Sequence, residues 1–271
     1  MRGTSLRRSV AAAPHLVWSV LFIIAPFLFI LYYSFTDKDG SFSFSNIADL
    51  FTWDYFSIFL RSISFAVIAT FICLLIAYPL AYALSRMKAH TQGILMMLIM
   101  LPMWMNLLIR TYCWMNLLET NGLINTLLGT DIVFLGTGGA VVLGMVYNFL
   151  PYMVLPICTV MSKIDKSLLD AADDLGCNPV RTVFKVVFPL SLSGVISGIT
   201  MVFVPSISTF YISQKMGGGS FDLIGDTIER QFMANTNYNM GAALSLILMI
   251  IVLISMAVMN RFGSEEGEII A

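Results

Sequence analysis

Acidic side chains collect in three polar segments of the sequence and could attract a cationic solute. Residues 37–61, 110–131 and 215–230 together contain nine acidic and five basic residues, a formal charge of −4. A negatively charged vestibule favours entry of a cation. Alternatively, the acidic excess is only what remains when Lys and Arg are excluded from the external loops of a membrane protein. The acids that we select as candidates follow a glycine run: Asp222, Asp226 and Glu229.

Four aromatic residues lie in or beside apolar stretches that border these polar segments. A Trp or Tyr ring can bind an amine through a cation–π contact. The alternative is that the rings anchor helices at the membrane–water interface, where Trp and Tyr are enriched. The candidates for a substrate pathway are Trp104, Tyr112, Trp114 and Tyr211.

The remaining reactive side chains do not form a catalytic or metal-binding pattern. The four cysteines, Cys73, Cys113, Cys158 and Cys177, are scattered singly, and there are only two histidines. The sequence has no G-x-x-x-x-G-K-[ST] motif, so any ATP that drives transport must be hydrolysed by another subunit. A net charge of −1 gives no basic surface for nucleic acid. We therefore predict that the chain is no enzyme and itself binds no metal or cofactor.

The elements that position these residues follow from the distribution of charge. The composition is 58% apolar and 11% charged, about half the charged fraction of a globular protein. Six tracts of 21 to 31 residues contain no Asp, Glu, Lys or Arg. A helix needs about 20 mostly apolar residues to cross a bilayer, and barrel strands would give much shorter segments. The sequence therefore predicts an all-α integral membrane protein with six transmembrane helices.

The expected spans belong to a single transmembrane domain over residues 1–271. Lys and Arg are enriched in cytoplasmic loops. An internal N-terminus places ten of these cations inside and five outside, so we expect both termini in the cytoplasm. No span contains an interior ionisable residue, which disfavours a proton-coupled carrier. The predicted spans are residues 16–35, 62–84, 94–109, 140–160, 190–212 and 240–259.

The internal loop 161–189 has the pattern of two short amphipathic helices that meet at a corner. Ser167 and Asp170 resemble a capping box and predict the start of the first helix, which Gly176 then ends. Asn178 as N-cap and Pro179 at the first helical position predict the start of the second. The expected arrangement is a docking surface for another protein.

This loop resembles the cytoplasmic signature of the permease subunits of binding-protein-dependent ABC importers. That signature is Glu-Ala-Ala, three residues, Gly, nine residues and Ile-x-Leu-Pro. The chain has Asp170-Ala171-Ala172, Gly176, Val186, Phe188 and Pro189 at matching positions, with conservative changes at 170, 186 and 188. The resemblance implies a type I importer permease fold and a coupling helix that docks on an ATPase subunit. The coupling residues that it implies are Asp170, Ala171, Ala172, Gly176, Cys177, Asn178, Pro179 and Pro189.

A narrower resemblance extends along most of the chain. Residues 101–114, 121–125, 210–213, 216–218, 223–225 and 231–232 are similar to the B-type permeases of the spermidine/putrescine branch of the family. This implies a polyamine importer of the bacterial inner membrane. Its other parts would be a second, homologous C-type permease, a dimeric ATP-binding subunit that holds ATP and Mg, and an extracytoplasmic polyamine-binding protein. The alternatives are a permease of the same type for thiamine or ferric iron and, from a different class, an intramembrane enzyme or a channel that acts alone.

Overall fold

The computed structural model describes residues 14–37, 39–219 and 221–267. Within these ranges the chain is helical and contains no strand, only an isolated bridge between Thr36 and Phe42. The prediction of an all-α fold is confirmed. Four of the cations that we used to predict the orientation, Arg2, Arg7, Arg8 and Lys38, lie outside the described residues.

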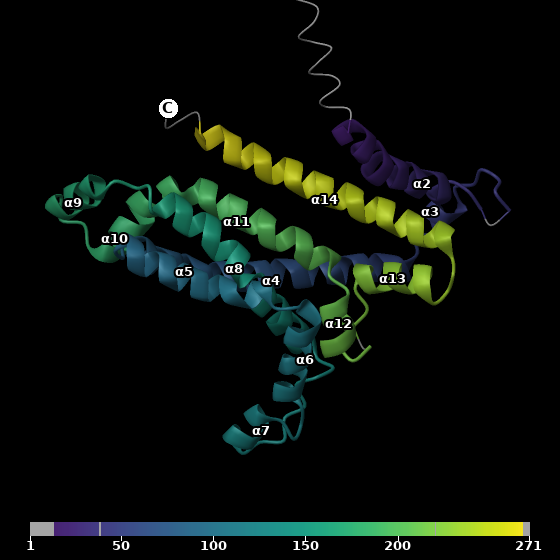
Figure 1. The fold of residues 1–271 in the computed structure, drawn as a ribbon, viewed down its shortest axis with the longest axis horizontal. Helices are drawn as coiled ribbons and strands as arrows, with labels where there is room; N and C mark the ends of the chain where they lie inside the picture. The colour runs from purple at the N-terminus through teal and green to yellow at the C-terminus, as the bar shows by residue number, and fades with distance from the viewer. Residues whose placement is uncertain (1–13, 38, 220, 268–271) are drawn as a thin grey trace, which may run out of the picture. The chain divides into compact units, whose positions relative to one another are not determined.

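The helices follow one another with short connections (Figure 1). In chain order they are η1 (Val20–Ile24), α2 (Ala25–Ser34), α3 (Ser45–Asp49), α4 (Trp53–Ser85), α5 (Ala89–Trp104), α6 (Leu107–Leu118), α7 (Leu123–Leu128), α8 (Gly138–Met161), α9 (Lys166–Asp174), α10 (Pro179–Thr182), η2 (Val183–Val187), α11 (Phe188–Ser208), α12 (Tyr211–Met216), α13 (Ile224–Met233) and α14 (Tyr238–Gly267). The two η segments are single turns of π-helix.

Five helices of the described chain are long and apolar enough to cross a membrane. They are Pro14–Ser34, Trp53–Ser85, Gly138–Met161, Pro179–Ser208 and Tyr238–Met259. A sixth span is present if the bent pair Ala89–Trp104 and Leu107–Leu127 is counted as one. Five of the six predicted tracts are thus helices of spanning length, although the fifth ends at Ser208 and not at residue 212.

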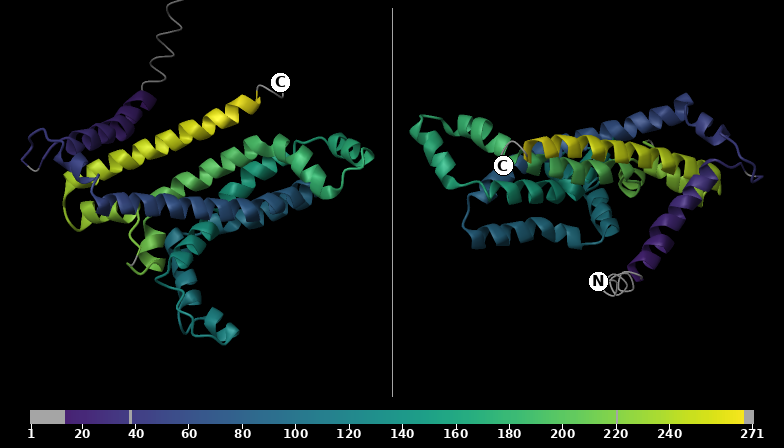
Figure 2. Two further views of the ribbon diagram at one scale, coloured as in Figure 1. Left: turned by 180° about the vertical axis from the view of Figure 1, so that it is seen from behind. Right: turned by 90° about the horizontal axis from the view of Figure 1, so that it is seen from above.

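The third tract differs from the predicted span 94–109. Its helix stops at Trp104, and the chain turns by 92° into α6 (Figure 2). Met105 has an extended backbone, and the side chain of Asn106 accepts a hydrogen bond from the Leu108 N–H at 2.8 Å. An asparagine in this position starts a new helix, because it satisfies one of the free N–H groups at the N-terminus. The prediction that one helix continues to Ile109 is therefore wrong.

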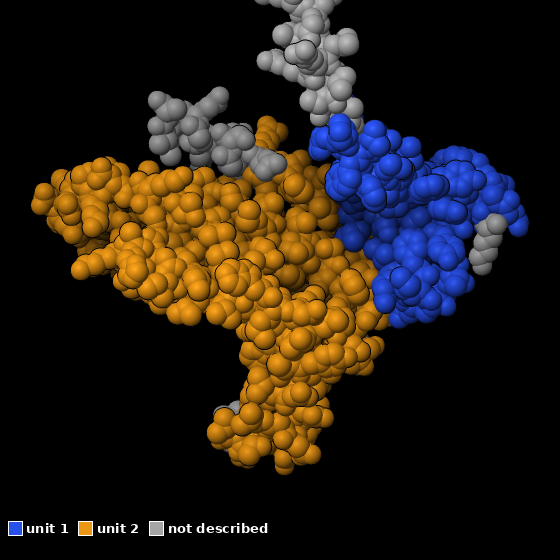
Figure 3. All heavy atoms as spheres, in the orientation of Figure 1, with its two compact units in different colours: residues 1–57, 227–250 blue, residues 58–226, 251–271 orange. Residues whose placement is uncertain are grey.

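The chain forms two compact units, which are coloured separately in Figure 3. Unit 1 comprises residues 1–57 and 227–250. In its described part, Asn239 donates to the carbonyl oxygen of Thr36 at 2.6 Å, and Asn46 donates to the same oxygen at 2.9 Å. These two amides fix the turn that follows α2.

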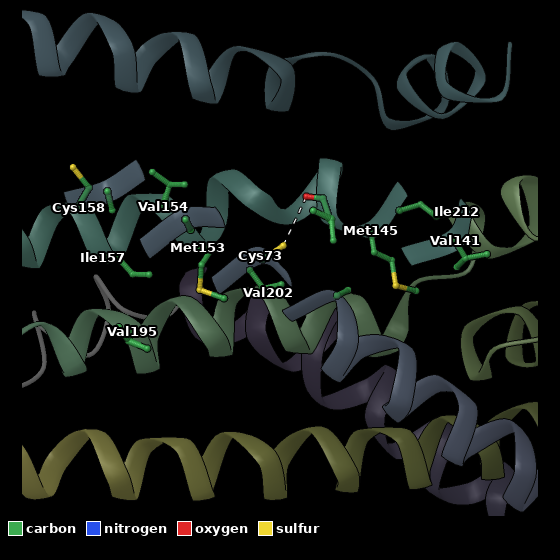
Figure 4. Close-up of a cluster of buried hydrophobic side chains, with 14 of the residues drawn as sticks. Cys73, Val141, Met145, Met153, Val154, Ile157, Cys158, Val195, Val202 and Ile212 are labelled. Atoms are coloured by element: carbon green, nitrogen blue, oxygen red, sulfur yellow. Dashed lines mark hydrogen bonds between the residues drawn. The ribbon is translucent and has the colours of Figure 1, made fainter. Parts of the chain in front are cut away.

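Unit 2 comprises residues 58–226 and 251–271, and its core is formed mainly by α4, α8 and α11. Helices α8 and α11 run side by side in both views of Figure 2, and Figure 4 shows Met153 and Ile157 of α8 beside Val195 and Val202 of α11. Gly194 and Gly198 face α8, because a Cβ atom at Gly194 would lie 3.0 Å from the Pro156 carbonyl oxygen. Small residues four apart let two membrane helices approach closely.

The fifth span begins earlier than the predicted residue 190. Helices α10, η2 and α11 form one continuous run, Pro179–Ser208, so the second helix of the loop is not a separate short element. The Phe188 N–H donates to the Val183 carbonyl oxygen, which is the hydrogen bond of a π-turn. Pro189 follows at once and has no N–H to donate. A π-turn contains one residue more than an α-helical turn. Here it joins α10 to α11, so the chain stays helical through Pro189 and into the span.

Candidate functional site

Helix α9 forms the first half of the loop and is capped by a residue other than the predicted one. Its N-cap is Asp165, whose carboxylate accepts the Ser167 N–H at 3.0 Å, and not Ser167 itself. The backbone N–H and then the hydroxyl of Ser167 hold the pKa of Asp165 below its ordinary value. An ionised carboxylate also interacts favourably with the positive end of the helix dipole. The predicted capping box of Ser167 and Asp170 is therefore wrong by two residues.

Gly176 ends α9 as the sequence predicts. The Cys177 N–H donates to the Ala172 carbonyl oxygen at 3.0 Å, and the Gly176 N–H donates to that of Asp173 at 2.9 Å. This pair of bonds is a Schellman motif, which requires a left-handed residue after the helix. Gly176 has a φ of +74°, a value that glycine adopts without steric cost. The corner between α9 and α10 thus depends on a residue without a side chain.

The start of the second helix is confirmed. The Asn178 side chain accepts the Arg181 N–H at 2.8 Å, and Pro179 occupies the first helical position. Proline is suited to that position because its φ is already helical. Asn178 and Pro179 are exposed, and Cys177 is half-buried. Among the other residues that the resemblance implicates, Asp170, Ala171 and Pro189 are exposed, and Ala172 is buried.

Large apolar side chains surround this corner and are exposed to solvent. Leu175 is 85% exposed, and Val180 and Phe184 are also mostly exposed. Ile164 and Leu169 from the same loop instead pack against the core of unit 2. The loop is therefore attached to the membrane helices on one side and presents an apolar surface on the other. Exposed apolar patches of this kind are typical of protein–protein contact sites.

Replacing Asn178 with alanine should weaken the first turn of α10. A lost N-cap costs about 1 kcal/mol, because the Arg181 N–H loses its acceptor. We expect faster amide hydrogen exchange at residues 179–182, measured by mass spectrometry on the purified protein. Asn178→Asp is the matched control and should exchange at the wild-type rate, since aspartate caps equally well. Equal exchange in the alanine variant would contradict this role.

Two of the four predicted aromatic residues lie together, one in the middle of α6 and one at the start of α12. The rings of Tyr112 and Tyr211 are 6.4 Å apart at 78°. The Lys215 ammonium lies 5.9 Å from the centre of the Tyr112 ring and 6.0 Å from that of Tyr211. Both distances are within cation–π range. In this structure the amine that lies over these rings is a lysine of the same chain.

The other two aromatic residues lie apart from this pair. Trp114 packs edge-on against Tyr147 of α8, with ring centres 5.2 Å apart. Trp104 lies at the C-terminal end of α5 and is largely exposed. The structure therefore does not assemble the four aromatic candidates into one site.

The three acidic candidates lie in or just before α13, and only Asp226 is in its first turn. Asp226 is buried, and its carboxylate accepts the Leu223 N–H at 2.9 Å, so it stabilises the turn into this helix. Asp222 and Glu229 are half-buried. Asp226 therefore has a structural role in this conformation.

Lys215 and Tyr147, which take part in these arrangements, and the buried Asn148 were not among the candidates from the sequence. Lys215 is four residues after Tyr211 on one helix, a spacing that places side chains on the same face and could have identified it. Tyr147 and its neighbour Asn148 come from an apolar span whose faces cannot be told apart by periodicity.

The chain is similar to known membrane components of bacterial transport systems. The family model described as binding-protein-dependent transport system inner membrane component matches residues 10–264. The spermidine/putrescine transport system permease protein PotB of Haemophilus influenzae is 35% identical over 256 residues, which cover 90% of each chain. PotB of Escherichia coli K12 is 37% identical over 246 residues, 86% of this chain and 90% of the relative.

Solved structures agree in fold. A chain of a bacterial ABC transporter that imports the acidic polysaccharide alginate superposes with a TM-score of 0.78 at 14% identity, over 97% of this chain and 96% of that one. At this identity the likeness concerns the fold alone, that of a type I importer permease. The matched family model and the PotB relatives describe membrane components of transport systems, in which ATP is hydrolysed by a partner subunit. The chain is therefore a multi-pass inner membrane protein that belongs to the family of binding-protein-dependent transport system inner membrane components.

Proposed function

We propose that this chain is one of two permease subunits that form the translocation pathway of an ATP-driven polyamine importer. The main support for polyamines as the substrate is the sequence identity of 35% to 37% to spermidine/putrescine permeases along most of the chain. The cation–π contacts of Lys215 support it, because they place an alkylammonium group against two aromatic rings. The external acidic excess would favour entry of a polycation.

The coupling role belongs to the corner around Gly176. An ATPase subunit that docks there would contact the exposed side chains of Leu175, Val180 and Phe184. The rigid Schellman turn and the continuous helix Pro179–Ser208 would transmit its movement to the fifth span. Both termini then lie in the cytoplasm with this loop. ATP and Mg would be held by the dimeric ATPase, and this chain binds neither.

The remaining partners follow from the same proposal. A second, homologous C-type permease would complete the pore, and an extracytoplasmic binding protein would deliver the polyamine. Trp104, Tyr112, Trp114, Tyr211, Asp222, Asp226 and Glu229 remain the candidates for the pathway. Tyr112 and Tyr211 could receive a substrate amine only when Lys215 leaves their ring faces.

The test is uptake of labelled spermidine and putrescine by cells with and without this chain, in the presence of its partner subunits. We expect saturable uptake that depends on the chain and on ATP and that persists when the proton gradient is collapsed. Excess thiamine and ferric iron should not compete. If polyamine uptake does not depend on the chain, or if thiamine or iron abolishes it, the proposed substrate is wrong. Purification with an ATPase would test the coupling role separately.

A further inference from the structure

The side-chain oxygen of Asn148, in the middle of α8, is a hydrogen-bond acceptor without a donor among the described residues. The residue is 3% exposed, and its Nδ2 donates to the Gly144 carbonyl oxygen of the same helix at 2.8 Å. Its Oδ1 has no hydrogen-bond partner among the residues that the structure describes. Buried polar atoms in native proteins are almost always paired, so a carbonyl oxygen left without a donor at this depth requires an explanation.

In the same turn of α8, a backbone carbonyl oxygen also lacks its usual helical hydrogen bond. Pro151 has no N–H, so it cannot form the helical hydrogen bond to the carbonyl oxygen of Tyr147, four residues earlier. Tyr147 and Asn148 are consecutive. One turn of α8 therefore presents a side-chain oxygen and a backbone oxygen that both accept hydrogen bonds.

Asn148 marks the point where one face of α8 changes from covered to open. One turn before it, α12 covers Gly144 so closely that a Cβ atom there would lie 2.7 Å from Ile212. On the same face and beyond Asn148, Tyr152 is 39% exposed and Leu155 is 37% exposed. Asn148 therefore lies between a residue that α12 covers and residues of the same face that are exposed.

Helix α12, which covers Gly144, already holds an alkylammonium group against aromatic rings. Lys215 belongs to α12, the helix that covers Gly144, and its ammonium lies over Tyr112 and Tyr211. The lysine side chain is a primary amine on a four-carbon chain, and a linear polyamine presents the same group. Trp114 packs against Tyr147 at 5.2 Å, so an aromatic pair borders the helix turn with the two acceptors.

Neutral oxygens suit a site through which a cation must pass. The tract 132–162 contains no Asp or Glu, so a cation in this part of α8 would meet no carboxylate of that tract. A cation that moves through a pathway must be bound strongly enough to enter and weakly enough to leave. Amide and backbone oxygens meet both requirements better than a buried carboxylate would.

We infer that Asn148 Oδ1, together with the Tyr147 carbonyl oxygen, accepts a hydrogen bond from an ammonium group of the transported amine during its passage. This inference rests on the proposed polyamine function and names a contact within it. Asn148 is then a residue of the pathway, one helical turn from the position at which α12 covers Gly144.

The first test measures spermidine uptake by the complete importer in proteoliposomes. Asn148→Leu removes the acceptor at nearly constant volume and should lower uptake about tenfold, the factor expected for one hydrogen bond to a charged group. ATP hydrolysis stimulated by the loaded binding protein should stay within about twofold of wild type, which shows that the variant folds and assembles. Ser206→Ala is the matched control: its buried hydroxyl donates to the Val202 carbonyl oxygen of its own helix at 2.7 Å, so uptake should not change.

A second test does not depend on transport activity. Asn148→Cys is made in a chain whose native cysteines are replaced by alanine, and the introduced thiol is labelled with an aminoethyl methanethiosulfonate. Spermidine should slow labelling during ATP turnover, whereas glycerol should not. Wild-type uptake in Asn148→Leu, or labelling that spermidine does not slow, would overturn the inference while leaving the polyamine function intact. An absence of spermidine uptake in the wild-type importer would overturn both.

Discussion

Gly176→Asp is expected to abolish ATP-dependent uptake while the protein remains in the membrane. The residue has a φ of +74°, where a side chain other than glycine costs about 1–2 kcal/mol. The new carboxylate would also lie in the exposed corner beside Leu175, on the surface that we propose for the ATPase. The measurement is uptake by the assembled importer, together with the amount of ATPase that co-purifies with the chain.

The matched control is Gly129→Asp. Gly129 also has a left-handed backbone, with a φ of +63°, and no atom lies within 4 Å of the Cβ position at either glycine. The backbone cost is therefore similar, but Gly129 ends α7 and lies outside the coupling loop. We expect the control to keep uptake within about twofold of wild type. Normal uptake by Gly176→Asp would show that the corner around Gly176 is not needed for coupling.

Gly194→Leu should lower the stability of unit 2. A Cβ atom at this position would lie 3.0 Å both from the Pro156 carbonyl oxygen and from the Val160 Cβ. Neither atom can move without shifting α8, so the new side chain must separate α8 from α11. Overpacking of this kind costs about 1–3 kcal/mol. The measurement is the midpoint of thermal unfolding in detergent, which should fall by several degrees.

Gly93→Leu is the control for the same substitution in a helix. Gly93 lies in α5 and is exposed, and no atom lies within 4 Å of its Cβ position. The substitution there should leave the midpoint unchanged or raise it slightly, because leucine favours a helix more than glycine does. Equal midpoints for the two variants would mean that the close approach of α8 and α11 contributes little to stability.

The α8–α11 pair connects the two regions for which we propose functions. Asn148 lies on α8, and the coupling corner is joined to α11 through the continuous helix that begins at Pro179. Gly194 and Gly198 hold these helices together between the two regions. A rigid pair of this kind would let movement at the loop reach α8.

The sequence alone determined most of the membrane spans and the corner of the loop. Charge-free tracts predicted the spans, because a helix across a bilayer must exclude ionised groups along its whole length. Gly176, Asn178 and Pro179 predicted the corner, since left-handed turns and helix starts depend on local backbone preferences. These features involve residues within a few positions of one another. A single sequence contains that information.

Only the tertiary structure decided which residues meet. The turn after Trp104 lies within an apolar tract, and only Asn106 marks it in the sequence. The contacts of Lys215 with Tyr112 and the unsatisfied oxygen of Asn148 depend on helices distant in the chain. In a membrane helix all faces are apolar, so hydrophobic periodicity does not reveal which face is packed. The packed face is set by shape, at positions such as Gly144 and Gly194, once the helices have come together.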